Sequence, residues 1–217
     1  MSAIAGVFRR DGAPACEGDL RPVLDAMAPR IRGEWIVWSS GAVVLAASQP
    51  VDASGAEPPF ARGRDGVARV ADARLDGETA APASPDAERD AVLDAYQSGN
   101  LGRLAGDLAV AVWDAERRRV TCARDALGTK PLYFAESESS FAFATEPRAL
   151  ARLPGVDSTP DPAAIAWHLA LRPFGAQRSF YRGVRPVPPG ARVTCDARGV
   201  RIDPPDQYCL LPRPLRL

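Results

Sequence analysis

The sequence contains few of the residues that usually mark metal sites, disulfide frameworks or polyanion binding. Lys130 is its only lysine, His168 is its only histidine, and its 4 cysteines form no CxxC pair. Because no cysteine lies near the histidine in the sequence, a zinc site is not expected. The 27 Lys and Arg residues balance the 27 Asp and Glu residues, so the charge does not indicate a nucleic-acid partner.

Long hydrophobic runs are also missing. No stretch approaches the roughly 20 apolar residues that a membrane-spanning helix needs. The first residues do not show the charged segment and apolar run of a signal peptide. We therefore expect a cytoplasmic protein without a membrane partner, whose cysteines are free thiols.

The remaining composition is that of a globular protein, with 46% hydrophobic and 25% charged residues in 217 positions. Apolar runs bounded by turn residues predict strands at residues 4–8, 35–38, 42–47, 66–75, 108–113, 119–123, 131–135, 141–144, 191–195 and 200–202. Helical spacing of apolar residues predicts helices at 20–27, 86–97, 146–153 and 161–172. Residues 48–65 are rich in Pro, Gly, Ala and Ser, and are interpreted as a surface loop.

Successive hairpins with interspersed helices favour the α+β class. Several strands are apolar on both faces, such as residues 108–113 with the sequence LAVAVW. Such strands need cover on both sides, so two stacked, mainly antiparallel sheets between helix layers would satisfy them.

Four stretches resemble one family. Residues 1–8, MSAIAGVF, resemble the Met-Cys-Gly-Ile-Ala-Gly opening of class II glutamine amidotransferases. Residues 106–114, GDLAVAVWD, and 123–133, ARDALGTKPLY, resemble two further family motifs. Residues 143–150, FATEPRAL, resemble the family's Phe-Ala-Ser-Glu segment. The resemblance is to the asparagine-synthetase type and extends to about Tyr208.

The resemblance implies a four-layer αββα sandwich, the fold of N-terminal-nucleophile hydrolases. It also implies an amidotransferase type 2-like domain over residues 1–208. Residues 209–217 are then a tail, or the start of a linker to an ATP-dependent synthetase domain that this sequence does not include. ATP and magnesium would belong to that domain, because the family's pyrophosphate-binding Ser-Gly-Gly-x-Asp-Ser loop does not occur here.

The family reaction is glutamine hydrolysis by an N-terminal cysteine whose α-amine acts as the base. Ser2 occupies that position, and a hydroxyl is a weaker nucleophile than a thiolate. By motif matching, Val44 stands where an arginine would bind the substrate carboxylate, and valine cannot do so. Asp72 and Ala73 match the family's oxyanion segment, where an ionised Asp72 accepts rather than donates hydrogen bonds. Glu88 or Asp86 could match the acidic residue that holds the substrate amine.

Other residues of the matched motifs are interpreted as structural. Arg124 and Asp125 are expected to form a polar pair that fixes the turn before Gly128, and Lys130 and Pro131 belong to the same turn. His168 is expected to be a packed or surface residue on its helix.

Three functions follow from this pattern. The first is a degenerate glutaminase-type domain, non-catalytic by itself, that serves an ATP-dependent amide-forming synthetase. Its partners would be the synthetase and a precursor peptide, because the cysteine-less β-lactam synthetases and lasso-peptide cyclases resemble this case most. The second is a serine-based amidohydrolase or glutaminase that uses Ser2. The third is a truncated gene product without function.

Overall fold

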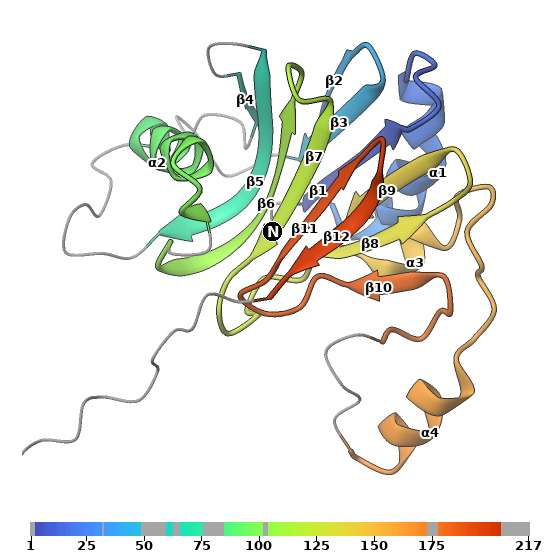
Figure 1. The fold of residues 1–217 in the computed structure, drawn as a ribbon. Helices are drawn as coiled ribbons and strands as arrows, with labels where there is room; N and C mark the ends of the chain where they lie inside the picture. The colour runs from blue at the N-terminus through green and yellow to red at the C-terminus, as the bar shows by residue number, and fades with distance from the viewer. Residues whose placement is uncertain are drawn as a thin grey trace, which may run out of the picture.

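A computed structural model describes residues 3–31, 33–48, 60–62, 66–75, 85–101, 104–172 and 178–204. Two six-stranded antiparallel sheets are stacked face to face (Figure 1). The first sheet has the order β10-β8-β9-β1-β3-β2 and the second has the order β12-β11-β7-β6-β5-β4.

The strands of the first sheet are β1 (Ala3–Arg9), β2 (Trp35–Ser40), β3 (Val43–Ser48), β8 (Tyr133–Glu136), β9 (Ser140–Ala144) and β10 (Val184–Pro186). Those of the second sheet are β4 (Phe60–Arg62), β5 (Val67–Leu75), β6 (Gly106–Asp114), β7 (Arg119–Arg124), β11 (Arg192–Asp196) and β12 (Gly199–Asp203). The helices are α1 (Glu17–Met27), α2 (Pro85–Gln97), α3 (Pro147–Leu150) and α4 (Pro162–Leu169), and a short 3₁₀ helix covers Ala28–Arg30.

Three apolar clusters separate these elements into four layers. The central cluster lies between the sheets and includes Ile4 and Phe8 of β1, Phe143 of β9 and Trp113 of β6. A second cluster packs the outer face of the first sheet against α1 and α3, and a third packs the second sheet against α2. The order α1/α3, sheet, sheet, α2 confirms the expected αββα sandwich of the α+β class.

The side chains of β1 point alternately to the two faces of the first sheet, so this strand contributes to two apolar clusters. Ile4 and Phe8 face the second sheet, whereas Ala5 and Val7 face α1. Gly6 lies on the inner face, where a Cβ atom would stand 2.5 Å from the ring of Phe143. Glycine therefore leaves room for the ring of Phe143, the residue opposite it on β9.

Several element boundaries differ from the sequence-based expectation. The residue after the C-cap of α4, Leu171, has a φ of 54°, and this left-handed turn ends the helix before residue 172. α3 is only 4 residues long and begins at Pro147. The expected loop at 48–65 contains β4, which pairs with β5, while residues 49–59 and 63–65 lie outside the described residues.

No helix among the described residues is long and apolar enough to span a membrane.

Candidate functional site

The candidate site lies at the end of the sandwich where β1 begins. In the first sheet, Ala3 is opposite Ser48, and Ala5 is opposite Ala144 at the end of β9. β8 begins at the same edge, because Tyr133 is opposite Ala144. Residues 125–132 connect this edge directly to the end of β7 in the second sheet. The end of β5 and the beginning of β6 lie beside the end of β7, so both sheets contribute to one site.

Hydrogen bonds hold the beginning of β1 on both sides. The Ala3 amide donates to the Ser48 hydroxyl over 2.9 Å, and the Thr145 amide donates to the Ile4 carbonyl over 3.1 Å. Ser48 is fully buried and Thr145 is 6% exposed. The Thr145 hydroxyl has no hydrogen-bond partner within the described part of the chain. Ser2, the expected nucleophile position, lies outside the described residues.

Val44 lies away from this end. It is opposite Val7, and its side chain is fully buried in the cluster against α1. Ser48, four residues further along β3, is the residue beside the beginning of β1. Val44 therefore belongs to the outer core of the first sheet, and its match to the family's carboxylate-binding arginine stays a prediction.

Asp72 and Lys130 form an ion pair across the site. The Lys130 Nζ atom lies 2.9 Å from Asp72 Oδ1, and Asp72 is 9% exposed. Asp72 follows Val70 by one strand repeat and so lies on the face of β5 that is turned toward the first sheet. At the position matched to the family's oxyanion segment, the site therefore holds a carboxylate whose charge is balanced by an ammonium group.

Ala73, the next position of that segment, faces the other way and packs against the cluster beneath α2. Glu88 lies on α2, but its side chain and that of Asp86 fall outside the described residues.

The turn that carries Lys130 is held by Asp125. Its carboxylate accepts hydrogen bonds from the backbone amides of Leu108, Leu127, Thr129 and Lys130, at 2.8–3.3 Å. Burial opposes ionisation of Asp125, but the amides of Lys130 and Thr129 outweigh it and lower the pKa of this carboxyl. Asp125 thus fixes the backbone from which the Lys130 side chain reaches Asp72.

Arg124 bonds the same turn from the other side. Its guanidinium donates to the backbone carbonyls of Gly128, Lys130 and Val187 rather than to Asp125. Burial lowers the pKa of Arg124. Gly128 has a φ of 68°, and a Cβ atom there would stand 3.0 Å from Arg124 Cζ, so glycine suits the turn in both respects. Pro131 is exposed and directly precedes the buried Leu132.

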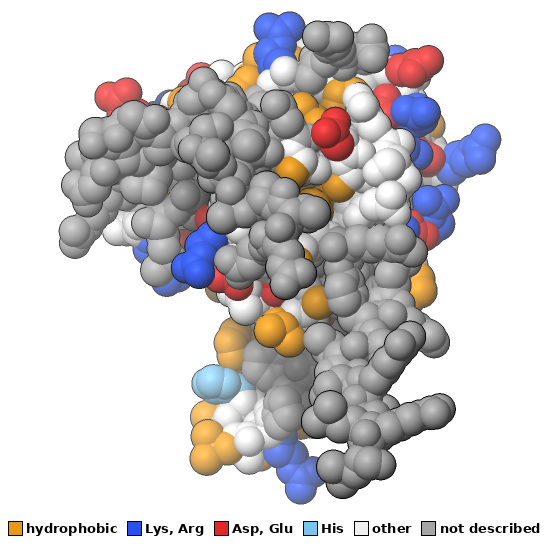
Figure 2. Space-filling view, turned by 90° about the vertical axis from the view of Figure 1, so that its left-hand side faces the viewer, with side chains coloured by type: hydrophobic (Ala, Val, Ile, Leu, Met, Phe, Trp, Pro, Cys, Tyr) orange, Lys and Arg blue, Asp and Glu red, His pale blue; other side chains and the backbone are white. Residues whose placement is uncertain are grey.

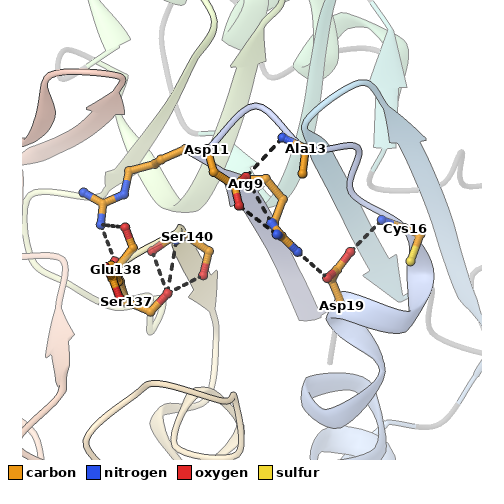
Figure 3. A network of polar contacts seen from close by, with 9 residues as sticks. Arg9, Asp11, Ala13, Cys16, Asp19, Ser137, Glu138 and Ser140 are labelled. Atoms are coloured by element: carbon orange, nitrogen blue, oxygen red, sulfur yellow. Dashed lines mark hydrogen bonds and ion pairs between the residues drawn. The ribbon is translucent and has the colours of Figure 1, made fainter.

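A second polar network lies at the opposite end of the first sheet (Figure 3). Arg9, at the end of β1, bonds both Asp11 and Asp19, and Asp19 accepts the Cys16 amide at the start of α1. A cavity of about 240 Å³ beside it is lined by Arg9, Asp19 and serines of the β8–β9 hairpin. The carboxylates of Asp11 and Asp19 are both used in bonds to Arg9 and to backbone amides. We therefore assign this network to the stabilisation of the start of α1 rather than to the candidate site.

Cys122 and Cys195 lie in the core between the sheets. Burial raises the pKa of the Cys195 thiol to about 12, and burial also raises the pKa of Cys122. Neither thiol can therefore supply a thiolate near neutral pH. Within the described residues there is also no group of three or more His, Cys, Asp or Glu side chains that could hold a metal ion.

Sequence reasoning missed Ser48 and Thr145 as residues of the site. Thr145 stands inside a motif that was recognised, but its position next to β1 depends on pairing between distant strands. Ser48 stood at the boundary of an expected loop, and only the register of β1 with β3 places it opposite Ala3.

Comparison with solved structures defines the class of the fold. The chain resembles glutamine phosphoribosylpyrophosphate amidotransferase from Bacillus subtilis, with a TM-score of 0.57 and 12% identity over 93% of this chain and 48% of that one. A structure described as the allosteric regulatory enzyme of purine biosynthesis gives a TM-score of 0.58 at 13% identity, again over 93% and 48% of the two chains. At such low identity, these likenesses show the sandwich fold alone.

The sequence comparisons identify the family. Residues 79–208 match the glutamine amidotransferase domain model. Putative asparagine synthetases are 34% identical over 119 residues in Mycobacterium tuberculosis and 31% over 95 residues in Methanocaldococcus jannaschii. Asparagine synthetase 3 of Bacillus subtilis is 29% identical over 108 residues. The chain belongs to the glutamine amidotransferase domain family, in the class II form of the asparagine synthetases.

The matched regions are 44–51% of this chain but only 15–18% of these relatives. Most of each relative therefore lies outside the region shared with this protein.

Proposed function

We propose that this chain is an amidotransferase domain that no longer hydrolyses glutamine and serves as a structural module of an ATP-dependent amide-forming synthetase. The observation that carries the proposal is the Asp72–Lys130 ion pair at the end of the sandwich where β1 begins. The chemistry of the site supports the loss of glutamine hydrolysis. The resemblance to synthetases supports the role as a module of a synthetase.

Glutamine hydrolysis needs hydrogen-bond donors for the oxyanion of the tetrahedral intermediate. Asp72 places a carboxylate at the family position of such a donor. The strongest donor nearby is the Lys130 ammonium, and the Asp72 carboxylate accepts it at 2.9 Å. An oxyanion at this end would therefore compete with Asp72 for Lys130 and would lie close to a like charge.

The nucleophile position supports the same conclusion. Ser2 replaces the cysteine that family enzymes use, and a hydroxyl needs stronger activation than a thiol to attack an amide. Val44 lies in the outer core, so the proposal does not depend on its match to the family's arginine. The proposal thus rests on Ser2 and Asp72.

A synthetase that lacks glutamine-derived ammonia needs another nitrogen nucleophile. We propose that this nucleophile is an amine of the acceptor substrate itself, such as a precursor peptide. The resemblance of the opening residues and of residues 72–76, DARLD, to the cysteine-less cyclases supports this substrate class. ATP and magnesium would then bind to the synthetase part of the system.

The experiment is a glutamine turnover assay with two variants. The purified chain, Ser2→Ala, and the double variant Ser2→Cys with Asp72→Asn are incubated with glutamine, and glutamate is quantified. We expect no glutamate above the buffer control from the wild-type chain. Glutamate that appears with the wild type and disappears with Ser2→Ala would overturn the proposal in favour of a serine-based amidohydrolase.

A second arm tests the synthetase role. The synthetase-type polypeptide from the same genome is assayed for ATP-dependent AMP or ADP release with and without the chain. Binding of the chain, or a stimulation by it, supports the proposal. If the chain neither binds nor alters this activity, a structural role in such a system is ruled out.

A further inference from the structure

α4 stands apart from the four layers of the sandwich (Figure 1). Its only buried residue is Ala164. The beginning of the helix is anchored, because Asp161 accepts the amides of Ala163 and Ala164 and forms an ion pair with Arg178 at 2.7 Å. The second half of the helix projects into solvent.

Large apolar side chains are concentrated on this projecting half. Trp167 is 42% exposed, Leu169 is 77% exposed and Leu171 is 93% exposed. Figure 2 shows hydrophobic side chains gathered on the lobe formed by α4. We define the α4 surface as the large, exposed apolar residues of this lobe: Ile165, Trp167, Leu169, Leu171 and Phe180.

The sequence of the helix indicates that this surface is normally covered. α4 has the sequence PAAIAWHL and is apolar around almost its whole circumference. A helix of this kind is typically buried, whereas a helix on a free surface has a polar face. Single exposed leucines are common, but a cluster of them marks a site of interaction.

Leu171 strengthens this interpretation. It follows the C-cap of α4 with a φ of 54°, a position that usually holds glycine. A leucine there carries a backbone cost as well as the cost of exposing its side chain to water. Contact with a partner would remove the Leu171 side chain from water and offset the cost of its exposure. Such contact explains why leucine occupies a position where glycine would form the turn more readily.

The charges around the surface indicate what kind of partner fits. Arg172, Arg178 and Arg182 outnumber the two acidic residues of the same segment, Asp157 and Asp161, and Asp161 is paired with Arg178. Two copies of this surface would bring like charges together. The matching partner therefore presents an apolar patch bordered by carboxylates.

The length of the relatives indicates which polypeptide is the partner of the α4 surface. The shared region is 15–18% of the synthetases that match, so each of them contains a large body outside the region shared with this chain. We infer that the α4 surface is the docking surface for the synthetase-type polypeptide of the system. This inference rests on the proposed function and adds to it the place of contact.

The test uses the full chain and the synthetase-type polypeptide from the same genome, expressed separately. Binding is measured by isothermal titration calorimetry for the wild type, Leu169→Asp, Leu171→Gly and the control Ile202→Asp. Ile202 is an exposed large apolar residue on β12 and lies outside the α4 surface. We expect at least about tenfold weaker binding for each α4 variant and unchanged binding for the control.

Leu171→Gly separates docking from folding. Glycine relieves the left-handed turn, so this variant should melt at a higher temperature than the wild type while binding more weakly. A merely structural leucine would not produce this combination.

The remaining outcomes distinguish the inference from the proposed function. Equal binding by the wild type and both α4 variants would overturn the docking surface while the proposed function stands. Absence of binding by the wild type would overturn both. Sedimentation analysis of the chain alone completes the test, because a dimer that Leu169→Asp dissociates would assign the surface to a second copy and contradict the inference.

Discussion

Replacement of Asp125 by alanine should destabilise the protein more than any other single charge removal at the candidate site. Asp125 is 4% exposed, and its carboxylate accepts hydrogen bonds from four backbone amides. Apart from the amide of Leu108 in β6, the two shortest bonds come from Thr129 at 2.8 Å and Lys130 at 3.1 Å. A hydrogen bond to a charged group contributes about 1.5–3 kcal/mol. Loss of these two contacts should therefore lower the free energy of unfolding by about 3–6 kcal/mol.

The assay is urea denaturation at pH 7, followed by circular dichroism and tryptophan fluorescence. For a chain of this size the melting temperature should fall by about 10 °C. Asp203→Ala is the matched control, because Asp203 forms an ion pair with Arg201 at 2.9 Å on an edge strand and such pairs contribute about 1 kcal/mol at most. An Asp125→Ala variant that unfolds within about 1 kcal/mol of the wild type would refute the reasoning.

Three further predictions concern the same core and site. Stability should decline as the pH falls through the folded-state pKa of Asp125, which is lowered by its amide contacts, and the urea midpoint of Asp125→Asn should depend less on pH between neutral and acidic conditions. Gly6→Ala should lower the free energy of unfolding by about 1–3 kcal/mol, because its methyl group would stand 2.5 Å from Phe143. A double-mutant cycle of Asp72→Asn and Lys130→Met should give a coupling energy of about 1 kcal/mol in urea denaturation.

The controls for these predictions are specific. A profile for Asp125→Asn that is as steep as that of the wild type would show that other groups cause the acid sensitivity. Gly18→Ala in α1 should leave stability unchanged or slightly higher, since its Cβ meets only Cys16 Sγ at 3.4 Å. If Gly6→Ala behaves like Gly18→Ala, the Phe143 ring can move away from position 6 at little cost in free energy. Additive effects of the two site substitutions would show that Asp72 and Lys130 do not interact.

Much of the sandwich could be predicted from the sequence, because its strands are apolar runs bounded by turn residues. Residues 108–113 were expected to be buried on both faces, and in β6 the side chains alternate between the central cluster and the cluster beneath α2. The order of strands was not predictable in the same way. β1 pairs with β3 and β9, and these partners are fixed by contacts between distant residues.

The candidate site was harder to predict, for the same physical reason. In an apolar strand such as β3, a shift in register leaves a plausible sequence match, so the sequence alone does not show that Ser48 rather than Val44 lies beside the beginning of β1. Asp72 was identified, but its partner was not, since the two residues are 58 positions apart. The presence of a single lysine in the chain was the one local signal that pointed to Lys130.

The most direct test of the central claim follows the side-chain nitrogen of glutamine. The chain is mixed with the synthetase-type polypeptide, ATP, magnesium and glutamine labelled with ¹⁵N in the side-chain amide, and ¹⁵N-ammonium and glutamate are measured by mass spectrometry. The account predicts neither product above the level seen with Ser2→Ala, even in the assembled system. Release of labelled ammonium by the wild type that is lost in Ser2→Ala would contradict it.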